Sequence, residues 1–98
     1  MNNRLRPIHP GEILNEEYLK PLNMNANSLA KALRVPATRT GDILKEKRSI
    51  TPDTAMRLAC YFGGDAQSWL NLQSIYDLKM AELEIYPQIK MEVLPRPQ

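Results

Sequence analysis

The chain has 98 residues, of which 43% are hydrophobic and only 6% aromatic, so one domain with a modest, mainly aliphatic core is expected. Its single cysteine, Cys60, excludes an intrachain disulfide, and we expect that thiol to be buried on an apolar helix face. No stretch approaches the roughly 20 apolar residues of a membrane span, and no signal peptide is apparent, so the sequence predicts a cytoplasmic protein.

Positive charge is concentrated in the middle of the chain, although the formal net charge is only +2. Between residues 28 and 57, seven basic and three acidic side chains give a local excess of four positive charges. Such a segment favours a polyanionic partner, with a solvated basic surface as the alternative.

The first predicted helix begins at "HPGE" and ends before Pro21. Pro10 suits the first helical position, and Glu12 is placed to interact with the helix start. His9 and Glu12 could also suggest a metal or acid–base site. One histidine and one cysteine are too few for a typical zinc site, so a role at the helix start is favoured.

A short second helix is predicted within "NANSLAKALRV", where Asn25 or Asn27 can be the N-cap. The next segment, "PATRTGDIL", is poor in strong helix formers but ends with an apolar anchor. Together the two segments are typical of a helix-turn-helix. Ala30 must be small where the two helices cross, and Pro36 starts the second, which would lie in the major groove of DNA.

Two longer helices are predicted over residues 52–62 and 66–86. Thr51 can cap the first, and Asp53 lies in its first turn, where the helix dipole favours a carboxylate. Asp65 can cap the second. The apolar stripe of this last helix is wide enough to contact a partner as well as the core.

Residues 1–86 are therefore predicted to form a helix-turn-helix DNA-binding domain, and residues 87–98 a tail. Within the tail, "IKMEV" alternates apolar and charged side chains after Pro87, which is the pattern of a short strand. Because a lone strand is not stable, we expect it to pair with a copy from a second subunit. The last helix and this tail are the predicted dimer contacts.

Four segments, "HPGEIL", "LAKALRV", "KRSITPDTAMRLACYFG" and "WLNLQSIYDL", together resemble the HigA antitoxins of the XRE-type helix-turn-helix proteins. The resemblance extends from Ile8 to Leu78. It implies an all-α, five-helix, lambda-repressor-like domain that forms a homodimer and binds a palindromic operator in its own promoter. It also implies neutralisation of a HigB toxin, a ribosome-dependent mRNA endonuclease. No catalytic triad or phosphate loop is recognisable, so neither enzyme activity nor a cofactor is expected.

The chain departs from the family pattern inside the helix-turn-helix. Arg34 stands where the turn usually has glycine, and a left-handed backbone would cost Arg34 roughly 1 kcal/mol. An apolar residue is usual where Thr40 stands, so looser packing of the recognition helix is expected. The family often has a longer polar residue at Gly41 or Asp42, so base contacts from these positions do not carry over.

The predicted DNA contacts follow from the docking of a helix-turn-helix. Thr38 and Arg39 are expected near base edges, and the basic residues after the second helix near phosphates. The start of the preceding helix can offer backbone N–H groups and a hydroxyl to phosphate. The full predicted set is Asn27, Ser28, Pro36, Ala37, Thr38, Arg39, Gly41, Lys45, Lys47 and Arg48.

Two alternatives remain open. The departures at Arg34, Thr40, Gly41 and Asp42 would also fit a protein that neutralises a toxin without specific DNA binding. A phage-type repressor without a toxin partner is the other alternative, and the "HPGEIL" and "WLNLQ" segments argue against it.

Overall fold

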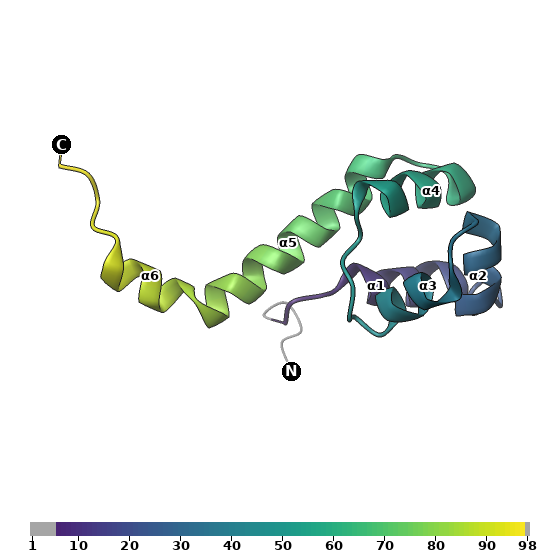
Figure 1. The fold of residues 1–98 in the computed structure, drawn as a ribbon, viewed down its shortest axis with the longest axis horizontal. Helices are drawn as coiled ribbons and strands as arrows, with labels where there is room; N and C mark the ends of the chain where they lie inside the picture. The colour runs from purple at the N-terminus through teal and green to yellow at the C-terminus, as the bar shows by residue number, and fades with distance from the viewer. Residues whose placement is uncertain (1–5, 98) are drawn as a thin grey trace.

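A computed structural model of the chain describes residues 6–97, and every regular element in that range is helical, which confirms the predicted all-α domain but not the strand expected in the tail. The elements are, in chain order, α1 (Pro10–Ile13), its π-helical continuation η2 (Leu14–Leu19), α2 (Ala26–Leu33), α3 (Ala37–Leu44), α4 (Pro52–Phe62), α5 (Ala66–Glu84) and α6 (Tyr86–Glu92). Figure 1 shows α1 to α4 gathered at one end, with α5 leading away to α6. The described chain is therefore elongated, with extents of 53 × 32 × 23 Å. Within it, no helix combines the length and apolarity needed to cross a bilayer.

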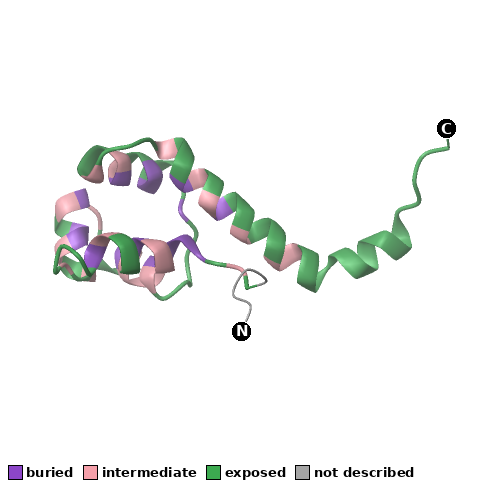
Figure 2. Ribbon diagram, turned by 180° about the vertical axis from the view of Figure 1, so that it is seen from behind, coloured by how far each residue is buried: buried purple, intermediate pink, exposed green. Residues whose placement is uncertain are grey.

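The core lies where the first four helices meet the beginning of α5. It is mainly aliphatic, in line with the low aromatic content, and Trp69 closes it with its ring 5.3 Å from that of Tyr18. The buried members are Leu14, Leu19, Leu29, Leu33, Ile43, Ile50, Ala55, Leu58 and Trp69. Beyond Gln73, the side chains of α5 and α6 are exposed or only partly buried (Figure 2), so the domain core ends halfway along α5.

The predicted helix caps are confirmed. The side chains of Asn25, Thr51 and Asp65 accept hydrogen bonds from the N–H groups of the third residues of α2, α4 and α5. Each such cap contributes about 1 kcal/mol. Gly63, with a φ of 90°, ends α4.

His9 caps α1, which confirms its predicted role at the helix start. Its Nδ1 accepts the N–H of Gly11 at 2.8 Å, its side chain is buried, and its ring packs edge-on against Tyr76 at 4.9 Å. Glu12 does not contact the helix start through its side chain, because its carboxylate forms an ion pair with Arg6 at 2.8 Å. Among residues 6–97, no cluster of His, Cys, Asp or Glu could hold a metal ion.

The burial of His9 makes the stability depend on pH. Burial lowers its pKa below the ordinary value of 6.5, and a protonated Nδ1 could no longer accept the Gly11 N–H. The unfolded chain therefore binds this proton first, so the free energy of unfolding falls as the pH drops below about 6.5.

We expect denaturant titrations to show this decrease between about pH 7.5 and about pH 5.5. His9→Asn, which keeps a capping side chain but cannot titrate, should show a smaller decrease over the same interval. An equal pH dependence in both proteins would contradict the prediction.

The C-terminal tail corrects the predicted strand. Residues 86–92 form helix α6, so the strand expected over residues 89–93 is wrong, and residues 6–97 contain one helix more than the five expected. Pro87 does not end helical structure, because it lies in the first turn of α6, where its missing N–H costs nothing. The apolar residues of this segment are all exposed, so their alternation does not mark a buried sheet face.

Cys60 corrects a second expectation. It is exposed, not packed in the core. It follows the buried Leu58 by two positions, which in a helix places it on nearly the opposite face.

Candidate nucleic-acid interface

The predicted helix-turn-helix is formed by α2 and α3. Arg34 ends α2 with φ 60° and ψ 48°, which confirms the left-handed conformation expected there. The N–H of Val35 then bonds to the carbonyl of Ala30 at 3.0 Å, and Pro36 is the N-cap residue of α3. Because this turn is tight, α2 and α3 pack directly against each other, and Ala30 in α2 is buried.

Thr40 ties α3 to the start of α2. It is only 1% exposed, and its single hydroxyl hydrogen is shared between the carbonyls of Ala26, at 2.9 Å, and Ala37, at 3.1 Å. A buried hydroxyl with a partner carries little desolvation penalty. The looser packing of α3 expected from this polar residue is therefore not seen.

The first turns of α3 present a low, open surface. Pro36, Ala37 and Thr38 are exposed. A Cβ placed on Gly41 would meet no atom within 4 Å, so the surface of α3 is also open at this position. These small residues would let the helix backbone approach another molecule closely.

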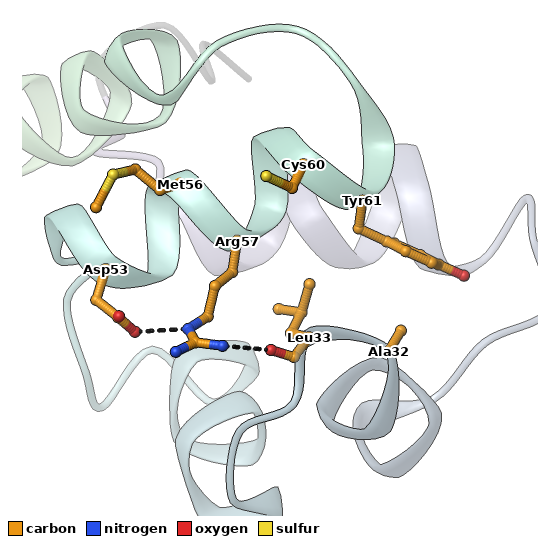
Figure 3. A pocket seen from close by; sticks show the side chains of 7 residues that line it. All are labelled: Ala32, Leu33, Asp53, Met56, Arg57, Cys60 and Tyr61. Carbon is orange, nitrogen blue, oxygen red and sulfur yellow. Dashed lines mark hydrogen bonds and ion pairs between the residues drawn. The ribbon is translucent and has the colours of Figure 1, made fainter.

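Arg39 is engaged in an ion pair in this structure. Its Nη1 lies 2.5 Å from Oδ2 of Asp53, and its side chain is only 29% exposed. The same carboxylate oxygen accepts Nε of Arg57 at 2.9 Å, and Nη1 of Arg57 donates to the carbonyl of Leu33 at 2.9 Å. Figure 3 shows Asp53, Arg57 and Leu33 at the edge of a groove between α2 and α4. The two guanidiniums, Arg57 first, hold the pKa of Asp53 below its usual range.

The start of α2 is largely committed to its own cap. The N–H of Ser28 donates to Oδ1 of Asn25 at 2.9 Å. The Ser28 hydroxyl accepts the N–H of Asn25 at 2.9 Å and lies 3.0 Å from its carbonyl, to which it can donate. The Ser28 groups assigned to phosphate are therefore already engaged, whereas Asn27 beside them is exposed.

Three cations follow α3 directly. Lys45, Lys47 and Arg48 are all exposed. Arg48 makes a long ion pair, 3.5 Å, with Asp42. Exposed pairs of this kind are weak, so Arg48 can exchange its partner at little cost.

Known proteins share much of this sequence, and some of them have solved structures of the same fold. The virulence-associated protein I of Dichelobacter nodosus is 64% identical over 80 residues, or 82% of this chain and 74% of that protein. The structure of an addiction module antidote protein of the HigA family from Coxiella burnetii is 53% identical, with a TM-score of 0.87 over 93% of this chain and 99% of that one. The Pseudomonas aeruginosa antitoxin HigA, solved with the higBA promoter, is 46% identical, with a TM-score of 0.91 over 94% and 100% of the two chains. No protein-family model matches the chain.

The chain belongs to the HigA antitoxin family. In this HigA-family chain the predicted contact residues form three groups: the start of α2, the first turns of α3, and the loop that follows α3. The hydroxyl of Thr40 brings the first two groups together, since it reaches from α3 to the first residue of α2.

Two residues next to the HigA helix-turn-helix were not recognisable as site residues from sequence. Asp53 is predicted only as a first-turn carboxylate of α4, and Arg57 only as part of the basic segment. The ion pair between Asp53 and Arg39 joins residues 14 positions apart in the chain, so no local sequence pattern indicates it.

Proposed function

We propose that this protein is an antitoxin that represses its own operon by binding operator DNA, and that it neutralises a HigB-like, mRNA-cleaving toxin. The observation that carries the DNA-binding part is the open first turn of α3, followed at once by three exposed cations. The likeness to an antitoxin solved with its promoter supports the same conclusion.

In this proposal α3 enters the major groove with its first turn toward the bases. Thr38 and Arg39 contact base edges, while Pro36, Ala37 and Gly41 keep the surface low. The cations Lys45, Lys47 and Arg48 bind phosphates. At the start of α2, Asn27 contributes a further phosphate contact, and Ser28 contributes less because its N–H and hydroxyl are already bonded to Asn25. With one arginine on the reading face, base contacts are few, so phosphate contacts and DNA shape carry much of the affinity.

A homodimer is part of the proposal. The second half of α5 and helix α6 expose an apolar groove, and Leu78 and Ile85, two of its residues, are 61% and 52% exposed. The groove is lined by Leu78, Ala81, Glu82, Ile85, Tyr86 and Ile89. Contiguous apolar surface of this kind marks an interaction site. In this proposal residues 1–86 form the DNA-binding domain and residues 87–98 form the tail. The tail contacts the second copy through helix α6 and not through a strand. Two recognition helices would then contact sites about 34 Å apart on DNA.

The test is a comparison of two DNA fragments by fluorescence anisotropy. We expect the wild-type protein to bind the region upstream of its own gene at least about 1,000-fold more tightly than a scrambled fragment of the same length and composition. Arg39→Ala should cost about 1–3 kcal/mol on the upstream fragment and much less on the scrambled one. Light scattering on the same samples measures whether two copies bind together.

The alternatives give different results. Equal binding of both fragments, together with co-purification of a small basic protein encoded by the neighbouring gene, would indicate a toxin-binding protein without operator recognition. Preferential binding of the upstream fragment without any such partner would indicate a plain repressor.

A further inference from the structure

We propose that Asp53 is a positioning residue for DNA recognition: it holds the guanidinium of Arg39 in one orientation at the start of α3 and thereby increases discrimination between operator and other DNA. The proposal rests on the DNA-binding function proposed above. It adds a residue outside the helix-turn-helix, on α4, to the determinants of specificity.

One carboxylate oxygen of Asp53 contacts two arginines. Oδ2 of Asp53 accepts both Nη1 of Arg39, at 2.5 Å, and Nε of Arg57, at 2.9 Å. Arg57 extends the chain of contacts to the carbonyl of Leu33 at the end of α2. These polar contacts therefore connect α4 to both helices of the helix-turn-helix, α3 and α2.

Asp53 is itself held firmly, so it can define where Arg39 lies. It stands in the first turn of α4, which is fixed by the Thr51 cap and by Pro52. Arg57 lies one turn later on the same helix and donates its Nε hydrogen to the same carboxylate oxygen. Because Asp53 and Arg57 lie on the same helix, their ion pair orients the carboxylate independently of Arg39.

The ion pair leaves Arg39 able to bind DNA. Asp53 occupies Nη1, and no other partner of this guanidinium occurs among residues 6–97. The edge formed by Nε and Nη2 is left for a second acceptor pair, and such an edge matches O6 and N7 of guanine. Since one end of the side chain is already ordered, less conformational entropy is lost when the other end binds a base.

The charge of Asp53 has the opposite effect on non-specific binding. The carboxylate is about half exposed, at 51%, and lies beside Arg39, on the surface proposed to face DNA. A negative charge there weakens binding that depends only on phosphates. Because the operator carries the same phosphates, this repulsion lowers both affinities alike, and the ratio of the two affinities is raised by the ordering of Arg39 alone.

The experiment is a double-mutant cycle between Asp53→Asn and Arg39→Ala, measured on the upstream fragment and on the scrambled fragment. Asp53→Asn should lower the ratio of the two affinities about fivefold to tenfold, with non-specific binding unchanged or tighter. In the Arg39→Ala background the same substitution should leave the ratio unchanged. Glu46→Gln is the charge control, because it removes one negative charge from the exposed loop between Lys45 and Lys47. It should not change the ratio.

An NMR measurement on the free protein separates failure of this inference from failure of the proposed function. The guanidinium resonances of Arg39 should show restricted rotation in the wild type and free rotation in Asp53→Asn.

If rotation is restricted and the operator is preferred, but Asp53→Asn lowers both affinities equally, the carboxylate is only structural and the inference is wrong. The inference is also wrong if the ratio falls as much without Arg39. If the wild type does not prefer the upstream fragment, the proposed function fails and this inference fails with it.

Discussion

Gly11→Ala is expected to destabilise the protein by about 3 kcal/mol, because the helix has no room for one more carbon at this position. A Cβ on Gly11 would lie 2.0 Å from the carbonyl oxygen of Ile43 and 2.9 Å from its carbon. Both are backbone atoms near the end of α3, so neither can rotate away as a side chain could. Relief would require α1 to move off α3, and with it the buried Leu14 and Ile43.

Gly41→Ala is the matched control for this prediction. It makes the same change within helix α3, where the added carbon meets nothing within 4 Å. Alanine is the better helix former, so this variant should gain about 0.5–1 kcal/mol. Denaturant titration of the two variants and the wild type measures both effects. A Gly11→Ala protein as stable as the wild type would show that α1 and α3 do not approach so closely.

Replacing Lys45, Lys47 and Arg48 together by Gln is expected to weaken binding to the upstream fragment on the order of 100-fold at moderate salt. All three side chains are exposed in the loop after the recognition helix. If each binds a phosphate, the slope of log affinity against log salt should become shallower by about one for every phosphate that the variant no longer neutralises. The preference for the upstream over the scrambled fragment should change little, because phosphate binding carries no direct sequence information.

A second triple variant controls for the removal of charge. Lys20, Lys79 and Arg96 are exposed cations outside α2, α3 and the loop after α3, and their replacement by Gln removes the same three charges. This variant should keep nearly the wild-type affinity and salt slope. Equal weakening by both triple variants would mean that overall charge, not the loop after α3, attracts the DNA.

Local sequence signals predicted most of the helices because the responsible contacts join residues close together in the chain. The cap at Asn25 bonds to Ser28, and the cap at Asp65 bonds to Ser68, each three residues later. The wrong prediction of a strand in the tail also came from a local signal. Residues 89–93 are too few for a period of 2 to be distinguished from a period of 3.6 when no side chain is buried.

The candidate site was predicted in part. The open first turn of α3 and the exposed cations after it follow from residue types alone, and the structure places them as expected. The capping box at Ser28 could have been recognised, since Asn25 and Ser28 have the spacing of that motif. The engagement of Arg39 could not, because it depends on where α4 lies.

By itself, then, the sequence determined where the domain helices begin and end, that they form a helix-turn-helix, and which small and basic residues follow the turn. Only the tertiary structure decided which side chains meet across helices. Arg39 pairs with Asp53 14 positions away, the buried Gln73 accepts the N–H of Ile50 23 positions away, and Gly11 lies against Ile43. The physical reason is that these contacts depend on how rigid helices pack, and packing is set by the whole core at once and not by any short stretch of residues.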